Sequence, residues 1–144
     1  MATIVPLCGW RYDEERAGSI RNLVTPPYDV IDAAAQEEYY RRSPYNIIRL
    51  EYGKELPGDD ARNNRYTRAA ECFYQWRSAG ILQPEKRPAV YLYRQRFDAG
   101  GESLVRTGVI CGVKLEPYEK GIILPHEETM PKHKADRLAL MRAC

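Results

Sequence analysis

The chain has 144 residues, of which 44% are hydrophobic and 29% are charged, and its formal net charge is +2. This composition is that of a soluble globular domain and excludes wholesale disorder, and the small net charge argues against a protein that coats nucleic acid nonspecifically. The apolar runs are too short to cross a bilayer, and the N-terminus lacks the basic and apolar pattern of a signal peptide. We therefore expect a cytoplasmic protein.

The first third of the chain is predicted to contain two short strands around one helix. Residues 22–25 are predicted to form a strand that ends at a double proline, because proline has no backbone donor and its ring restricts the backbone. Asp32 is a suitable N-cap for a helix over residues 33–42. Residues 46–52 alternate and are rich in β-branched side chains, a pattern that favours a second strand.

The middle of the chain is predicted to form a long helix and then a β-hairpin. Aromatic and alanine residues recur at helical spacing over residues 61–79, so we expect a helix there with Asp59 or Asp60 as its N-cap. Residues 89–97 and 103–116 have the composition of strands, and the intervening residues supply turn chemistry. The natural interpretation is an antiparallel hairpin.

A last helix is predicted to begin near Lys132 and to continue to Cys144. It carries Leu138 and Met141 on an apolar face and has no glycine cap. We therefore expect the chain to be the N-terminal part of a longer protein, whose C-terminal region would pack against this apolar face. Together the elements predict a single α+β domain over residues 1–144, with a small mixed sheet, a β-hairpin and about three helices.

Tyr28 and Asp29 follow the double proline and form the first candidate site. A carboxylate fixed on a rigid turn beside a tyrosine can act as a base, a metal ligand or a contact for a substrate amine. The alternative is an Asx-type turn that closes onto the following helix.

Arg49 and Glu51 form the second candidate site. On a strand, side chains two residues apart point to the same face, so the pair would either line a polar pocket or form a surface ion pair of little energetic value.

The strongest candidate precedes the last helix, where His126 and Thr129 are followed by Lys134 and Arg137. Free backbone N–H groups at a helix start suit a phosphate, and an arginine fork can grip it at two points. Cations at a helix start are mildly unfavourable by themselves, so their placement here is better explained if an anion binds there. The alternative is a capped helix with solvated charges.

Metal binding by this segment is disfavoured. His126 and His133 do not have the His-Glu-x-x-His order, and Pro131 lies between them, so one helical face cannot present both. Glycine-rich nucleotide fingerprints are also missing from the sequence.

Several motifs together resemble the family called domain of unknown function 1015. They occur in the family's order: PPYDVI (26–31), SPYN (43–46), RLE (49–51), LPHExT (124–129) and KADRLAL (134–140). Family members usually run to several hundred residues, so the resemblance implies that this is the N-terminal part. The family has no settled activity, and its members have been labelled as similar to ParB partition proteins.

That label implies a ParB/sulfiredoxin-like α+β fold that binds nucleotides. In this superfamily a polar motif before a helix cradles phosphates, and residues 126–137 are the matching place. Free serine kinases belong to the same superfamily, and genes of the family often lie beside serine-biosynthesis genes. The resemblance therefore implies a nucleotide-using enzyme with phosphotransferase activity on a small molecule such as free serine.

Phosphoryl transfer depends on positioning and charge neutralisation, so each candidate residue has an expected role. ATP or ADP with magnesium would be held by His126, Thr129, Lys134 and Arg137. The carboxylate that orients or deprotonates the acceptor hydroxyl would be Asp29 or Glu51, with Glu127 as third choice. The substrate would contact Tyr28 and Arg49.

Two other functions remain open from the sequence. One is a nucleotide-dependent ParB-like DNA-binding protein, although a basic face and a helix-turn-helix are not evident. The other is a non-catalytic scaffold.

If the first candidate site is real, Tyr28 and Asp29 should lie near the loop that contains His126.

Overall fold

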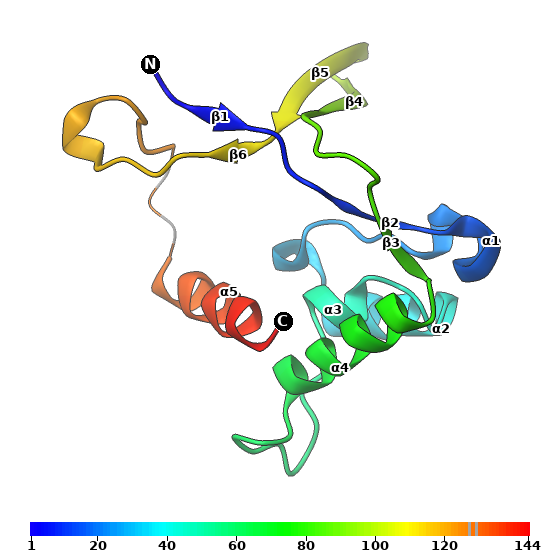
Figure 1. Ribbon diagram of the computed structural model, residues 1–144. Coiled ribbons are helices and arrows are strands. Elements are labelled where there is room, and N and C mark those ends of the chain that lie inside the picture. Colours follow the sequence, from blue (N-terminus) through cyan, green and yellow to red (C-terminus); the bar gives the residue numbers. More distant parts are fainter. Residues whose placement is uncertain (127, 129) are drawn as a thin grey trace. The chain divides into compact units, whose positions relative to one another are not determined.

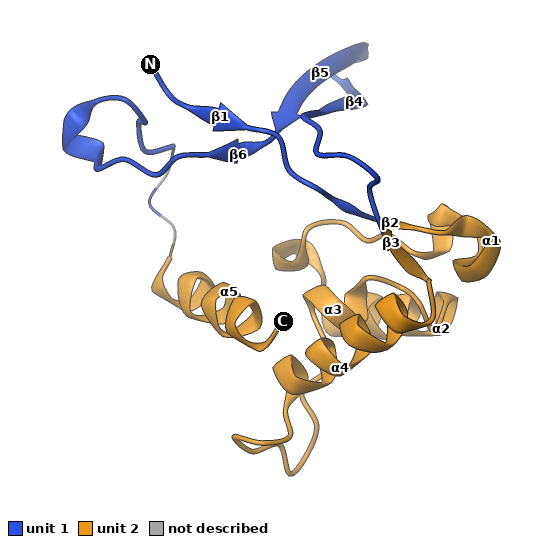
Figure 2. Cartoon of the chain, in the orientation of Figure 1, with its two compact units in different colours: residues 1–10, 84–128 blue, residues 11–83, 129–144 orange. Residues whose placement is uncertain are grey.

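The computed structural model describes residues 1–126, 128 and 130–144 and confirms the α+β class (Figure 1). The chain divides into two compact units (Figure 2). Unit 1 contains residues 1–10 and 84–128, and unit 2 contains residues 11–83 and 129–144.

Unit 1 is built around the predicted hairpin. Strand β4 (Tyr91–Ala99) pairs antiparallel with β5 (Glu102–Ile110), from Tyr91 opposite Ile110 to Ala99 opposite Glu102. Gly100 and Gly101 form the turn with φ values of +61° and +85°, as a two-residue hairpin loop of this twist requires. The hairpin prediction is confirmed, and its first strand begins two residues later than expected.

The remaining strands are short. In unit 1, β1 (Ile4–Val5) pairs antiparallel with β6 (Gly112–Val113). A Cβ added at Gly112 would lie 2.7 Å from the Val5 side chain, so a larger residue there would force that side chain to shift. The chain passes between the units within β2 (Trp10–Tyr12) and β3 (Leu82–Pro84), which pair with each other.

Unit 2 contains every α-helix that is found in the described part of the chain. The helices are α1 (Glu14–Ala17), α2 (Ala33–Arg42), α3 (Ile48–Glu51), α4 (Arg65–Ser78) and α5 (Pro131–Ala143). Single 3₁₀ turns are η1 (Ile20–Asn22) and η2 (Tyr28–Val30) in this unit and η3 (Tyr118–Lys120) in unit 1. Among the described residues, none of the helices has the length and apolar character that crossing a membrane would need.

Both strands predicted before residue 55 are wrong. Residues 22–25 are not a strand, because Asn22 ends η1 and the Leu23 N–H closes that turn by donating to the Ile20 carbonyl. The Leu23 side chain is fully buried in the core. Within residues 46–52, Ile48–Glu51 form α3 instead. Buried Asn46 lies just before this helix and accepts from the Ile48 N–H at 3.0 Å. The Asn46 side chain also donates to the Asn22 carbonyl at 2.7 Å. This tertiary contact outweighs the β-propensity of the segment.

Trp76 on α4 is the largest side chain in the core of unit 2. It is 4% exposed and contacts the rings of Tyr12 and Tyr45, with centroids 6.1 and 6.0 Å away. Leu23 and Ile81 complete this side of the core. Burial in this cluster raises the pKa of the Tyr12 hydroxyl, so the ring packs as a neutral group.

Two helix predictions are confirmed with changed starts. Helix α4 begins at Arg65 rather than residue 61, because Asn64 and Thr67 form a capping box. The predicted N-caps, Asp59 and Asp60, are wrong: Asp60 accepts from the N–H groups of Arg62 and Asn63, and Asp59 pairs with Arg68. In α5, Leu138 is 48% exposed and Met141 is 78% exposed, as the predicted apolar stripe requires.

Candidate functional site

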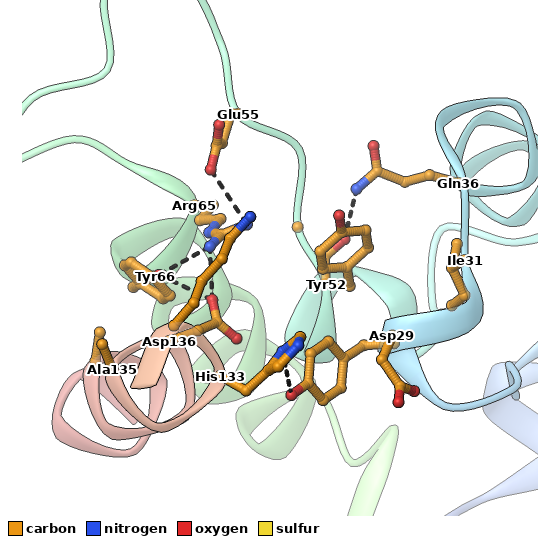
Figure 3. A pocket seen from close by; sticks show the side chains of 14 residues that line it. Asp29, Ile31, Gln36, Tyr52, Glu55, Arg65, Tyr66, His133, Ala135 and Asp136 are labelled. Carbon is orange, nitrogen blue, oxygen red and sulfur yellow. Dashed lines mark hydrogen bonds and ion pairs between the residues drawn. The ribbon is translucent and has the colours of Figure 1, made fainter. Parts of the chain in front are cut away.

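A cavity of unit 2 has a volume of about 800 Å³ and lies among η2, α4, α5 and the segment after α3 (Figure 3). This size is within the range of small-molecule sites, which is roughly 300–1,000 Å³. Elements far apart in sequence build it, because η2 and α5 are separated by a hundred residues of the chain. The residues that the argument below uses are Tyr28, Asp29, Tyr52, Arg65, Lys132, His133 and Asp136.

Tyr28 joins η2 to helix α5. Its hydroxyl lies 3.0 Å from Nδ1 of His133, and the two rings meet edge to face at 5.6 Å. The Arg137 guanidinium lies over the Tyr28 ring at 3.9 Å, a cation–π contact. These contacts fix the orientation of the His133 imidazole at the cavity wall (Figure 3).

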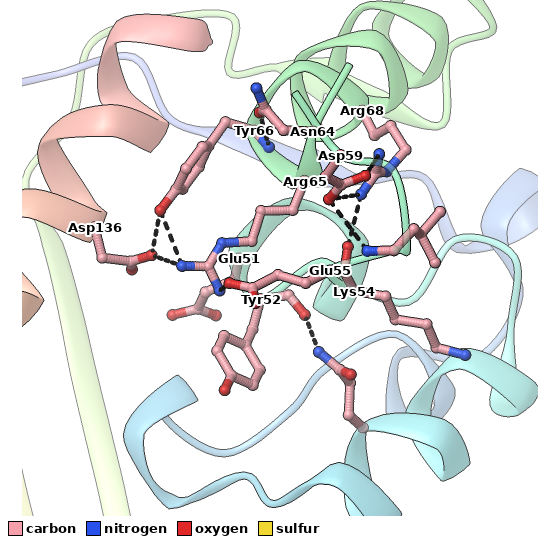
Figure 4. Close-up of polar contacts among 12 residues, drawn as sticks. Glu51, Tyr52, Lys54, Glu55, Asp59, Asn64, Arg65, Tyr66, Arg68 and Asp136 are labelled. Atoms are coloured by element: carbon pink, nitrogen blue, oxygen red, sulfur yellow. Dashed lines mark hydrogen bonds and ion pairs between the residues drawn. The ribbon is translucent and has the colours of Figure 1, made fainter. Parts of the chain in front are cut away.

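Asp136 connects α5 to α4. Its Oδ1 accepts from Arg65 at 2.6 Å and from the Tyr66 hydroxyl at 2.9 Å (Figure 4), and its Oδ2 accepts from Arg137 Nε at 2.8 Å. Burial by itself raises the pKa of Asp136, but the hydrogen bonds from Arg137 and Tyr66 and the two guanidinium charges outweigh it and lower the pKa. The carboxylate is therefore charged and serves two arginines at once.

Helix α5 begins at the cavity. Its N-cap, Met130, makes no side-chain capping bond, and Pro131 occupies the first turn. The N–H groups of Lys132 and His133 follow in the same turn, where a helix offers no internal acceptor. Lys132 is exposed and lines the cavity, so a cation and the positive end of the helix dipole lie at one edge of it.

The structure brings some of the predicted residues together. Tyr28 and exposed Asp29 both line the cavity. Arg137 contacts Tyr28 and donates to the Glu51 carbonyl at 2.9 Å, so the backbone of Glu51, rather than its carboxylate, makes the contact that the structure describes. The predicted strand face shared by Arg49 and Glu51 is wrong, because both residues lie on α3.

The other predicted residues lie elsewhere. Lys134 is exposed on α5 and does not line the cavity, and Arg49 lines a second, smaller cavity. Glu127 and Thr129 are outside the described residues. His126 belongs to unit 1, so its proximity to Tyr28 and Asp29 in unit 2 stays a prediction.

The sequence did not point to Arg65, Tyr66 or Asp136 as parts of a site. Arg65 and Tyr66 are the first residues of α4, and no motif marks their approach to α5. Asp136 has a signal, since an Asp-Arg pair lies inside the KADRLAL segment at 134–140. Within the described residues, no group of three metal-ligating side chains could hold an ion.

Comparison with protein families gives a match over nearly the whole chain. The model of the family described as "Protein of unknown function (DUF1015)" matches residues 4–144. Searches of curated proteins and of solved structures gave no match. Because the matched region includes every element described above, the chain belongs to the DUF1015 family.

Proposed function

We propose that unit 2 binds a nucleotide in the 800 Å³ cavity and takes part in phosphoryl transfer to a small molecule with a hydroxyl group. The observation that supports this most directly is that Lys132, the first turn of α5 and the exposed carboxylate of Asp29 border one cavity. The first acceptor to test is free serine, which the family resemblance implies.

The cavity wall offers different chemistry for each part of a nucleotide. The rings of Tyr28 and Tyr52, with centroids 6.3 Å apart, provide apolar faces for a base. Lys132 and the helix N–H groups provide charge and donors for phosphates. Magnesium would be held mainly by the phosphates and water, as is usual for this ion.

Asp29 would act on the acceptor. In the proposed reaction the terminal phosphoryl group leaves the nucleotide and bonds to the acceptor oxygen, whose proton passes to the Asp29 carboxylate. Asp136 is less suited to this role, because Arg65 and Arg137 already occupy its oxygens.

Nucleotide binding is tested by calorimetry with ADP and ATP, with and without magnesium. Lys132→Ala should weaken binding about tenfold to a hundredfold, since a charge-assisted contact is worth about 1.5–3 kcal/mol. Arg142→Ala, which removes a cation from the last turn of the same helix, should have a much smaller effect. Arg137→Ala is a poorer probe, because it also removes contacts with Asp136 and Tyr28.

The transfer step needs a separate variant. Asp29→Asn should leave nucleotide affinity nearly unchanged and lower phosphorylated serine below detection, measured by mass spectrometry. Equal losses of affinity for Lys132→Ala and Arg142→Ala, or no binding by the unaltered chain, would reject the nucleotide site. A fully active Asp29→Asn variant would reject the assignment of the base.

A further inference from the structure

A second cavity of about 170 Å³ lies beside the first in unit 2. Four cationic side chains line it: Arg49, Lys54, Arg65 and Arg68. Gly53 and Arg65 line both cavities, so the two share a wall. The volume equals roughly five or six water molecules at about 30 Å³ each, which is too small for a nucleotide and suits a small organic ion.

Three of the four cations are neutralised by carboxylates. Lys54 pairs with Glu37 at 2.5 Å. The shared-wall residue Arg65 pairs with Asp136 at 2.6 Å, and Arg68 pairs with Asp59 at 2.7 Å (Figure 4).

Arg49 differs from these three. Within the described part of the chain, no carboxylate forms an ion pair with Arg49, so its charge is not compensated there. Its Nη2 donates to the Tyr40 carbonyl at 3.0 Å, and the guanidinium lies over the Tyr40 ring at 4.2 Å. Its Nε is buried and has no hydrogen-bond partner among the residues that the structure describes. A buried donor without an acceptor is costly, and Arg49 is the cation lining this cavity that combines such a donor with an uncompensated charge.

We propose that the second cavity binds a small organic monocarboxylate, with Arg49 as the residue that binds the carboxylate. One uncompensated cation matches one negative charge, whereas a phosphate dianion would need further free cations. The Tyr40 ring, Leu56 and Cys72 give the cavity apolar walls for a short carbon chain. Burial raises the pKa of the Cys72 thiol, so this wall does not add a competing anion.

The shared wall gives this site a place in the proposed function. A carboxylate held at Arg49 would keep the rest of a small acceptor at the Gly53 and Arg65 boundary with the nucleotide cavity. This role as the acceptor site rests on the proposed phosphoryl transfer, but carboxylate binding does not.

The probe is 3-hydroxypropionate, with neutral 3-hydroxypropionamide as its matched control. Arginine Nε–H resonances of the intact chain are followed by NMR during titration, and the resonance lost in Arg49→Lys identifies Arg49. The Arg49 Nε–H should shift saturably with the carboxylate and not with the amide. Arg49→Lys should raise the dissociation constant, measured by calorimetry, about tenfold to a hundredfold, and Arg41→Lys on α2, outside both cavities, should not.

A second pair of variants tests the cavity without altering Arg49. Leu56 lines it and is 47% exposed, so polar replacements are tolerated. Leu56→Asp supplies a competing carboxylate and should weaken binding several-fold, whereas Leu56→Asn should weaken it much less. No saturable shift, equal shifts with the amide, equal effects of Asp and Asn, or tighter binding of inorganic phosphate than of the carboxylate would overturn the proposal.

ADP titrations of the same samples separate the two proposals. Carboxylate binding without ADP binding would leave the Arg49 site standing and reject the nucleotide function. ADP binding, with no response of the Arg49 resonance to the carboxylate, would leave the nucleotide function standing and reject the Arg49 site.

Discussion

Replacing Trp76 with alanine should lower the free energy of unfolding of unit 2 by about 3–5 kcal/mol. The indole is 4% exposed and packs against Tyr12 and Tyr45, so its removal leaves a cavity at the centre of the core. This loss is a large part of the 5–15 kcal/mol that is typical of a domain. Urea unfolding followed by far-UV circular dichroism measures it, because every described α-helix lies in unit 2.

Tyr74→Ala on the same helix is the matched control. Tyr74 is 51% exposed, so its loss should change the unfolding midpoint far less. Trp76→Phe keeps an aromatic ring and should give an intermediate midpoint, which is useful if Trp76→Ala does not fold. Similar midpoints for Trp76→Ala and Tyr74→Ala would show that the core does not depend on the indole.

Elements whose signals are local could be predicted from the sequence. Asp32 caps α2 by accepting from the Ala35 N–H at 2.8 Å, as predicted, and two adjacent glycines define the hairpin turn. The strand prediction for residues 46–52 is wrong, because the conformation of this segment also depends on two long-range hydrogen bonds. The Asn46 side chain donates to the Asn22 carbonyl, and the Ile47 N–H donates to the Leu23 carbonyl. Hydrophobic periodicity contains no information about such contacts.

In the candidate site, too, the parts with local sequence signals could be predicted and the long-range contacts could not. The rigid turn with Tyr28 and Asp29 is recognisable from the double proline that precedes it. In the structure both residues line the cavity. The contact between Asp136 and Arg65 was not, since it joins residues that are 71 positions apart on different helices. The strand prediction for Arg49 is wrong, but Arg49 still lines a cavity, because α3 presents it toward α4 residues such as Arg68 and Cys72.

Replacing Asp136 with asparagine should lower the free energy of unfolding at pH 7 by about 1.5–3 kcal/mol, the value of charge-assisted hydrogen bonds. The amide keeps the size of the carboxylate but leaves Arg65 and Arg137, whose side chains are 19% and 29% exposed, without their shared counter-ion. Helix α5 should loosen first, since Asp136 is its charged link to α4. Hydrogen exchange of the α5 amides, measured beside urea unfolding, would detect this.

The pH dependence distinguishes lost charge from altered packing. The folded state lowers the pKa of Asp136, so the carboxylate stabilises the protein above its unfolded pKa of about 3.9 and loses that effect as the pH falls through the lower folded value. The difference between the wild type and Asp136→Asn should therefore be constant from pH 7 to about pH 5 and shrink below about pH 4. Glu38→Gln removes an exposed carboxylate that pairs with Arg42 on α2, and its smaller effect should vanish in high salt. If the Asp136→Asn difference instead persists unchanged at pH 3, the effect comes from altered packing, and Asp136 is not the electrostatic link between the two helices.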